Sequence, residues 1–341
     1  MPIKFDDIHT EKKQFLLDEM MRVVTNEIHK IDEGEKNKKR ESCPVCNHRD
    51  IAFFTEKYGF YFDRCAACGL LFCNPYPTDE QIHYYYNSDM KNFENDFFME
   101  SFENRVQIFL PRIDIINKYK TRGSLLDVGS SVGVFIEALN RVNHHFDITC
   151  CDISEDACNR LKQRFPNTNI INSDFKLLKG SVKYDIMTMW DTVEHIIDLD
   201  GLFHSVKSIL LEEGVFIFST PNTKSFEWII ANKEHVQLLP PGHVNLLNID
   251  NIKILLKRHS FDMLDTYTLN PSLDIDYILK SARQNKINPV SIGVFLEKML
   301  MDEEFRTPFE KLLKEQGLAG NIVVAAKNKS NNDVLNRRGS K

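Results

Sequence analysis

Hydrophobic positions recur at two different spacings along the chain, and the spacing changes near residue 120. From residue 11 to residue 32 apolar side chains recur every three or four positions, which predicts one amphipathic helix. The polar run EGEKNKKR at 33–40 follows as a linker, so 1–41 is expected to be an N-terminal helix and linker. Short strand-like runs occupy 42–76, and a helical connector is expected over 77–119.

From residue 120 onward, short apolar runs alternate with amphipathic segments. SLLDVG, DITCCD, YDIMTMW and GVFIFST predict strands, whereas VFIEALNRV, EDACNRLKQRF and LDGLFHSVKSIL predict helices between them. Alternation of this kind is typical of a parallel, doubly wound α/β sheet. The domain is expected to span 120–328, with a helical insertion at about 274–316, a last strand NIVVAA at 321–326, and a disordered tail at 329–341.

Composition and charge narrow the classes of protein. The chain has 341 residues, of which 42% are hydrophobic and 27% charged, as is ordinary for a globular protein with room for two domains. A net charge of −6 argues against a nucleic-acid partner. No apolar run approaches the roughly 18 residues of a membrane span, and MPIKFDDIHTEKK lacks the apolar segment of a secretion signal. We therefore expect a cytoplasmic protein.

Two cysteine pairs stand close together in the first quarter of the chain. Cys43 and Cys46 form one C-x2-C pair, Cys65 and Cys68 form another, and 18 residues separate the pairs. This spacing predicts a tetrahedral zinc site, a zinc ribbon, to which each pair supplies two thiolates. Four thiolates close the coordination shell, so the expected zinc is structural. Cys73 is expected to lie outside the site, and four free buried cysteines are the alternative.

The stretch LLDVGSSVGVF joins a predicted strand to a predicted helix through a glycine turn. A dinucleotide-binding G-x-G-x-x-G would need glycines where Ser131 and Val134 stand, and its second glycine is the one that lets a pyrophosphate approach the backbone. No G-K-[ST] follows, which excludes a Walker A phosphate loop. The turn at Gly129 and Gly133 is therefore predicted to hold a ligand that places no pyrophosphate against it.

Acidic side chains end three of the predicted strand units. They are Asp127, Asp152 and Asp174. Ligands of such sheets bind across the carboxyl ends of the strands, so these carboxylates should face one crevice. Asp152 ends the second strand, where an acidic side chain can accept hydrogen bonds from two ribose hydroxyls.

Taken in order, D-x-G-x-x-x-G, CCDIS, NSDF, YDIMTMWDTVEHI and GVFIFSTPN resemble the motifs of class I S-adenosylmethionine-dependent methyltransferases. The resemblance covers about residues 120–270 and implies a seven-stranded Rossmann-like sheet with S-adenosylmethionine as co-substrate. A chain with a zinc ribbon before such a domain resembles a bacterial methyltransferase subgroup associated with sugars, surface polysaccharides and secondary metabolites. Many members have GCGTG where this chain has GSSVG, which keeps small residues at the turn.

The resemblance also implies which residues bind the cofactor. They are Asp127, Gly129, Ser131, Gly133, Asp152, Ile153, Asp174, Phe175 and Trp190. The glycine turn would contact the methionine part, Asp152 the ribose, and Asp174 with Phe175 the adenine. Trp190 either stacks on the adenine or packs beneath it, and both interpretations stay open.

Methyl transfer from a sulfonium is an in-line displacement, and a hydroxyl or amine nucleophile benefits from a nearby base. His243 in LPPGHVNLLN is the favoured base, because side chains on a Pro-Gly turn point outward; a surface or helix-capping role is its alternative. His195 in MWDTVEHI either bridges a loop and a helix or touches the substrate. Glu194 binds substrate, orients a histidine or caps the next helix. Of the three tyrosines at 84–86, one is expected to reach a site.

Three functions follow from these patterns. The main hypothesis is a methyltransferase acting on a small molecule, such as a sugar or nucleotide-sugar, with the chain a monomer or homodimer and the insertion a lid or dimer surface. An RNA methyltransferase that reads RNA through the ribbon is the second, although the basic residues of 42–76 are balanced by acidic ones. A non-catalytic zinc-ribbon binding protein is the third, and the retained Asp152 and glycine turn argue against it.

Overall fold

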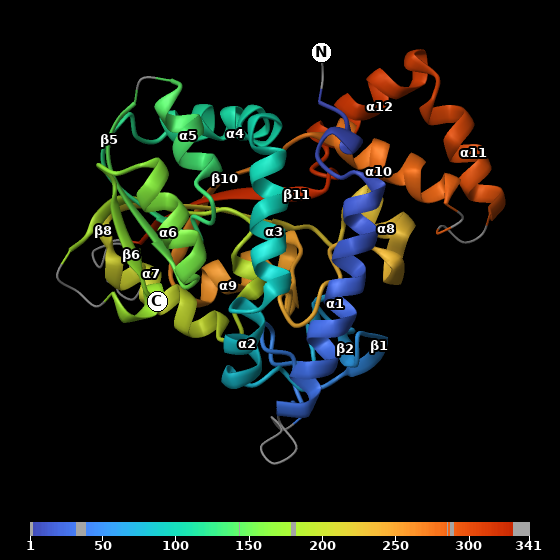
Figure 1. The fold of residues 1–341 in the computed structure, drawn as a ribbon, viewed down its shortest axis with the longest axis horizontal. Coiled ribbons are helices and arrows are strands. Elements are labelled where there is room, and N and C mark those ends of the chain that lie inside the picture. The colour runs from blue at the N-terminus through green and yellow to red at the C-terminus, as the bar shows by residue number, and fades with distance from the viewer. Residues whose placement is uncertain are drawn as a thin grey trace, which may run out of the picture.

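The computed structural model describes residues 3–31, 39–142, 144–178, 182–284, 286 and 290–329. Nearly all of the predicted linker at 33–40 and of the predicted tail at 329–341 lies outside these residues. The described chain contains a large sheet, a small sheet beside it, and helices that cover both (Figure 1). No described helix combines the length and the apolar character that crossing a membrane requires.

The large sheet has seven strands in the order β10-β11-β8-β7-β4-β5-β6. Their bounds are β4 Arg122–Val128, β5 His145–Asp152, β6 Asn169–Asn172, β7 Tyr184–Met189, β8 Leu210–Pro221, β10 Phe261–Thr268 and β11 Asn321–Asn328. The strands from β8 to β6 pair in parallel, whereas β11 pairs antiparallel with both β8 and β10. This order confirms the predicted doubly wound, seven-stranded sheet and the predicted strand NIVVAA, which is antiparallel to its neighbours.

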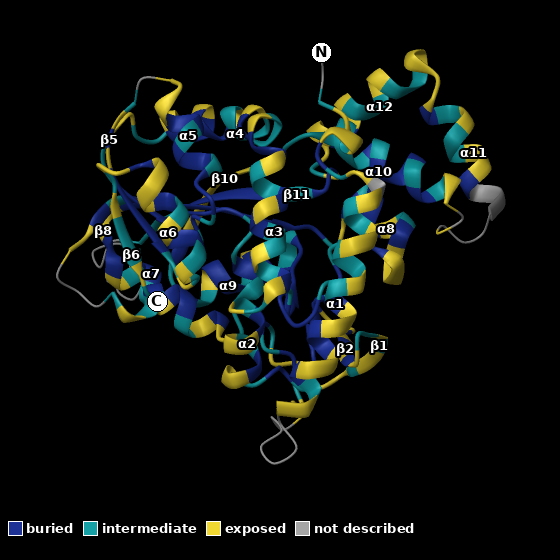
Figure 2. Cartoon of the chain, viewed as in Figure 1, coloured by how far each residue is buried: buried dark blue, intermediate teal, exposed yellow. Residues whose placement is uncertain are grey.

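Both faces of the large sheet are buried, and successive residues of a strand belong to different cores. Leu125 and Ile186 belong to one apolar cluster, and their neighbours Leu126 and Met187 belong to the other. This alternation is what a two-residue strand period requires when helices cover both faces. The connecting helices are α5 Val134–Asn140, α6 Glu155–Arg164, α7 Leu199–Ile209 and α9 Ile249–Arg258. Figure 2 shows the buried strands between helices whose outer surfaces are exposed.

The first predicted helix and the predicted helical connector are both present, on either side of the cysteine region. Helix α1 spans Glu11–Ile31 and contacts both α2 and α3. The connector consists of α2 Asp79–Tyr86, α3 Asp89–Glu100 and α4 Phe102–Asn117. Thr78 caps α2 by accepting a hydrogen bond from the Gln81 N–H, 3.2 Å away. Helix α4 packs against α5, which places the connector beside the first turn of the large sheet.

The cysteine region forms the small sheet, and its last strand comes from the other half of the chain. The order is β1-β2-β3-β9, with β1 Ile51–Lys57, β2 Phe60–Cys65, β3 Leu71–Cys73 and β9 Asn245–Leu246. The sequence predicts no strand at 245–246, which pairs antiparallel with β3. The amides of Asn248 and Asn251 both donate to the Cys68 carbonyl, at 3.2 and 2.9 Å. The cysteine region is therefore held directly against the α/β domain.

The insertion begins slightly before its predicted start and has a core of its own. It comprises α10 Pro271–Arg283, α11 Val290–Leu300 and α12 Glu303–Glu315. Helix α10 contacts the short helix α8 Phe226–Ala231, which follows β8. Ile275, Ile278 and Leu313 are buried in this third apolar cluster. In Figure 1 the insertion (orange to red) lies at the end of the molecule near α8 and the upper part of α1.

Candidate functional site

The four paired cysteines lie together at one place. The sulfur atoms of Cys43, Cys46, Cys65 and Cys68 are all within 4.8 Å of one another. Cys43 Sγ is 3.6 Å from Cys68 Sγ, and Cys46 Sγ is 3.5 Å from Cys65 Sγ. In a tetrahedral Zn site with Zn–S of about 2.3 Å, the sulfurs lie roughly 3.8 Å apart, so the cluster fits such an ion. Cys73 is buried in β3 and is not part of this group.

The glycine turn after β4 adopts left-handed backbone angles at three positions. Gly129 has φ 74° and Gly133 has φ 83°. A Cβ added at Gly129 would lie 2.4 Å from Thr192 Oγ1, so only glycine fits there. Ser131, between them, also has a positive φ of 48°. Its N–H donates to Asp152 Oδ2 at 2.8 Å, which explains how a non-glycine residue is held in this conformation.

Asp152 joins the glycine turn to the end of β5. Its second oxygen, Oδ1, accepts a hydrogen bond from the Ser154 N–H at 2.9 Å. Burial raises the pKa of this carboxyl above its ordinary value. Each carboxylate oxygen has a second lone pair, so Asp152 can still accept hydrogen bonds from a ligand.

The other two strand-end acids have different surroundings. Asp127 is buried beneath the turn, accepts a hydrogen bond from Thr188 Oγ1 at 2.7 Å, and has its pKa raised by burial to about 7. Asp174 caps a short 3-10 helix (Phe175–Leu177) by accepting from the Lys176 N–H at 2.9 Å. Phe175 is buried beside it, whereas Ile153 is largely exposed. The three carboxylates therefore end neighbouring strands but are not equivalent.

One cavity of about 1620 Å³ extends across these strand ends. Eight of the nine predicted cofactor residues line it; Gly133 does not. A Cβ at Gly133 would lie 2.4 Å from the Phe165 ring, so this glycine shapes the turn from behind. Side chains that are spread over residues 127–190 of the sequence thus line one cavity, at the edge where α/β sheets bind their ligands.

Trp190 and Asp191 follow β7 and are both fixed by packing. The Trp190 ring lies 5.3 Å from Phe135, and its Nε1 is a buried donor without a partner among the described residues. Asp191 has φ 50° and accepts hydrogen bonds from Ser219 Oγ at 2.8 Å and Asn321 Nδ2 at 2.6 Å. Asp191 is thereby tied to the ends of β8 and β11.

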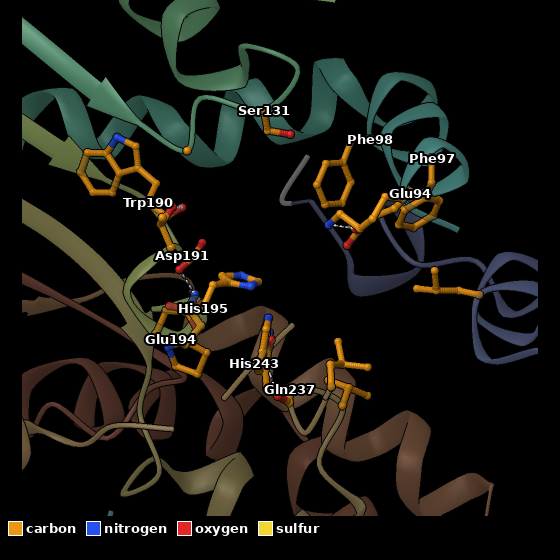
Figure 3. Close-up of a pocket in the computed structure, with 18 of the residues that line it drawn as sticks. Glu94, Phe97, Phe98, Ser131, Trp190, Asp191, Glu194, His195, Gln237 and His243 are labelled. Carbon is orange, nitrogen blue, oxygen red and sulfur yellow. Dashed lines mark hydrogen bonds and ion pairs between the residues drawn. The ribbon is translucent and has the colours of Figure 1, made fainter. Parts of the chain in front are cut away.

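The two predicted histidines lie against each other at the cavity wall (Figure 3). The His195 and His243 ring centroids are 4.6 Å apart and the rings are perpendicular. His243 Nδ1 lies 2.8 Å from the Gln237 carbonyl oxygen, which can only accept, so Nδ1 carries the proton and Nε2 the lone pair. Burial lowers the pKa of His243 to about 4 and that of His195 well below its ordinary value. Both rings are therefore neutral near pH 7.

Glu194 completes a group of three with these histidines. It is 1% exposed, and its Oε2 has no hydrogen-bond partner among the described residues. Burial, followed by the charge of Asp191, raises its pKa well above the ordinary value. One ligand atom from each of Glu194, His195 and His243 lies within 4.8 Å of the others. This set can exchange protons with a substrate, and its two imidazoles and carboxylate also suit a divalent cation.

The cavity also contains one of the three tyrosines at 84–86, and two arginines that the sequence did not single out. Of the three tyrosines, Tyr86 lines the cavity, and its hydroxyl is 2.9 Å from His195 Nδ1. Arg105 and Arg112 on α4 also line it, and their guanidinium carbons lie 4.1 Å above the rings of Phe98 and Phe109, respectively. Spacing on α4 indicates only an amphipathic helix, so no local signal distinguishes these arginines from surface charges.

The chain is similar to known methyltransferases. A family model described as a methyltransferase domain matches residues 103–266. The ubiquinone biosynthesis O-methyltransferase of Coxiella burnetii is 32% identical over 126 residues, which cover 35% of this chain and 53% of that protein. The enzyme of the same name from Colwellia psychrerythraea is 22% identical over 178 residues, covering 46% and 72% of the two chains. The chain thus spans about half the length of the first curated relatives it matches.

Solved structures include one O-methyltransferase with a similar trace. It is from the trans-AT PKS multienzyme of Brevibacillus brevis, in complex with S-adenosyl-L-homocysteine. It is 16% identical with a TM-score of 0.45, and the match covers 72% of this chain and 78% of that one.

The sheet order, the glycine turn and the strand-end acids define a Rossmann-like domain with a cavity at the carboxyl ends of its parallel strands, where ligands of such sheets bind. The family match makes the class more particular, because residues 103–266 match a methyltransferase domain. The resemblance noted in the sequence is therefore confirmed for this part of the chain.

Proposed function

We propose that the protein is an S-adenosylmethionine-dependent O-methyltransferase that acts on a small, sugar-like molecule in the cytoplasm. The observation that carries the proposal is the bond between the Ser131 N–H and Asp152, which joins the glycine turn to the β5 acid inside the cavity. Transfer to oxygen is favoured because the curated relatives are named O-methyltransferases.

The cofactor would lie across the ends of β4, β5 and β6. Asp152 would accept from the ribose hydroxyls with lone pairs that its two backbone donors leave free. The backbone of Gly129 and Ser131 would face the methionine part, and Asp174 with Phe175 would flank the adenine. The bound cofactor supplies an electrophilic methyl group on a positively charged sulfur.

The proposed base is His243. Its Nδ1–H is held by the Gln237 carbonyl, so the lone pair on Nε2 is available to take the proton of an acceptor hydroxyl. His195, hydrogen-bonded to Tyr86, packs edge-on against this ring and fixes its orientation. Glu194 lies next to the pair and would accept the proton from the imidazole or stabilise its positive charge.

The cysteine cluster is proposed to hold one structural zinc. Its support is the sulfur spacing together with the left-handed residue after each pair, Asn47 with φ 60° and Gly69 with φ 72°. Such residues reverse the backbone, so that both thiols of a C-x2-C pair point to one centre. The ion would then staple a small sheet that has little core of its own.

Two measurements test the proposed activity. Isothermal titration should show binding of S-adenosylmethionine, and radiolabelled methyl transfer to a panel of sugars and nucleotide-sugars should identify an acceptor. His243→Asn, which keeps a donor toward Gln237, should lower kcat at least tenfold without changing cofactor affinity. A protein that binds no S-adenosylmethionine in its zinc-loaded form would refute the function, and unchanged kcat in the variant would refute the base.

A further inference from the structure

A second set of polar side chains lines the same cavity but comes from outside the large sheet. Glu227 lies on α8, His235 follows that helix, and Asp274 and Tyr277 lie on α10 of the insertion. The proposed mechanism uses none of them. Their contacts nevertheless resemble those of a binding site more than those of a packed interior.

One ring nitrogen of His235 is a buried donor without an acceptor among the described residues. The ring is 3% exposed, and its Nδ1 accepts a hydrogen bond from the Gln237 N–H at 3.1 Å. Burial lowers its pKa to about 3, so the ring is neutral and its single proton is on Nε2. That Nε2 has no hydrogen-bond partner among the described residues. Trp228 and Tyr277 hold the ring in place, at centroid distances of 4.3 and 5.4 Å.

One carboxylate oxygen of Glu227 is a buried acceptor without a donor among the described residues. The residue is 4% exposed; its Oε1 accepts from Ser225 Oγ at 2.6 Å, and its Oε2 has no partner among the described residues. His235 Nε2 is 3.9 Å from Glu227 Oε1, which is too long for a hydrogen bond. One ligand oxygen placed between them could reach both side chains.

Asp274 brings a second carboxyl group to the same place. Its Oδ2 accepts from the Gly320 N–H at 2.8 Å. A Cβ built on Gly320 would lie 2.5 Å from Asp274 Oδ1 and 2.8 Å from Glu227 Oε1, so the two carboxyl groups flank this glycine. Burial raises the pKa of Asp274 to about 7 and that of Glu227 well above its ordinary value.

The unpaired donor and acceptor decide which ligand chemistry fits. A hydroxyl accepts from the His235 N–H and donates to Glu227 at once, whereas each group left unpaired costs about 1–3 kcal/mol. An ammonium group has no acceptor for the His235 proton. A carboxylate or phosphate has no hydrogen to donate to the unpaired oxygen of Glu227, which would stay without a partner.

The backbone of Gln237 links His235 to the proposed base His243. Its N–H donates to His235, and its carbonyl oxygen accepts from His243. A ligand bound at His235 would therefore be positioned relative to His243 through this single residue. Gln237 lies beside His243 in Figure 3.

We propose that Glu227, His235 and Asp274 form a hydroxyl-recognition subsite, through which the cavity binds a polyhydroxylated acceptor and the insertion selects the substrate. The proposal rests on the proposed function, because it takes the cavity to be the one where methyl transfer occurs. Buried polar groups built for a substrate hydroxyl discriminate strongly against analogues that lack it.

The two tryptophans of the chain allow a test that needs no methyl transfer. Trp190 lines the cofactor end of the cavity and Trp228 packs on His235, so two indole N–H signals from 15N-tryptophan protein report the two places separately. The probes are S-adenosylhomocysteine and the methyl α-D-pyranosides of glucose, galactose and mannose. Tetrahydropyran, methylammonium and acetate are the matched controls.

We expect S-adenosylhomocysteine to shift the Trp190 signal, and at least one glycoside to shift the Trp228 signal saturably with no such effect from the controls. His235→Phe keeps a ring between Trp228 and Tyr277 and should weaken glycoside binding at least tenfold. Glu227→Gln keeps the shape and should weaken it similarly, which serves if the first variant does not fold.

The outcomes separate the two proposals. A silent Trp228 signal with every glycoside, equal shifts with tetrahydropyran or acetate, or unchanged glycoside affinity in the folded variants overturns the subsite. Failure of the proposed function gives a different result, because Trp190 would then not respond to S-adenosylhomocysteine. The Trp190 response also shows that each variant is folded.

Discussion

Replacing Asp152 by asparagine tests the cofactor site with almost no change in shape. Both carboxylate oxygens accept a backbone N–H, from Ser131 at 2.8 Å and from Ser154 at 2.9 Å. The asparagine amide must direct its NH2 group at one of these donors, whichever way it is turned. One hydrogen bond to a charged acceptor, worth about 1.5–3 kcal/mol, is lost. The NH2 group also cannot accept from a ribose hydroxyl, and in one orientation the glycine turn loses its hydrogen bond to this side chain. Since about 1.4 kcal/mol corresponds to a factor of ten, affinity should fall roughly 10- to 100-fold.

Isothermal titration with S-adenosylmethionine and with S-adenosylhomocysteine measures this loss directly. Asp147→Asn is the matched control, because it removes an exposed carboxylate from the same strand. Thermal unfolding of both variants checks that the loss is local. A dissociation constant for Asp152→Asn within twofold of the wild type would show that the Asp152 carboxylate does not organise the cofactor site.

Four further outcomes follow from the structure. Elemental analysis should find about one zinc per chain, lost in Cys43→Ser and kept in Cys73→Ser, because Cys73 lies outside the sulfur cluster; equal loss in both would contradict the site. Since burial lowers the pKa of His243 to about 4, kcat should stay flat from pH 8 down to about pH 5 and fall near pH 4, whereas an apparent pKa near 6.5 would argue against this base. Burial raises the pKa of Asp127 to about 7, so the folded state binds this proton more tightly than the unfolded state. The free energy of unfolding should then fall as pH rises from about 4 to 7, by up to about 4 kcal/mol. Urea titrations at several pH values should show that the free energy of unfolding of Asp127→Asn depends less on pH. Gly129→Ala should weaken S-adenosylmethionine binding more than tenfold in the same titration, because the new Cβ would lie 2.4 Å from Thr192 Oγ1; unchanged affinity would show that the turn can relax.

The sequence predicts those elements whose signals are local. The central strands of the large sheet contain short apolar runs, α1 has regular helical spacing, and the C-x2-C pairs and the turn at Gly129 are short motifs. The strand at Asn245–Leu246 has no such signal, because two residues show no periodicity and pair only since the edge of β3 is presented to them. Helix α8, six residues long, was missed for the same reason.

The candidate site divides along the same line. Asp152 was predicted because strand-end positions in an α/β sheet converge by topology, and Ser131 because its turn resembles that of a known family. His195 and His243 were singled out separately, but nothing in the sequence shows that their rings touch or that Gln237 sets the tautomer. Glu227 and His235 were not predicted at all, since an ordinary helix and an ordinary loop become a site only when α10 covers them. Tertiary contact, not local pattern, defines these groups.

The pairing of β3 with β9 also bears on how the chain can be made and divided. Ribosomal synthesis releases the cysteine pairs early, yet the edge of β3 and the Cys68 carbonyl receive their partners only when residues 245–251 emerge. A fragment ending near residue 119 would expose an unpaired strand edge, a common cause of aggregation. A fragment starting near residue 120 would also have an unpaired strand, because β9, which follows His243, would lose its partner β3. The two regions are therefore best expressed, transplanted and evolved as one unit.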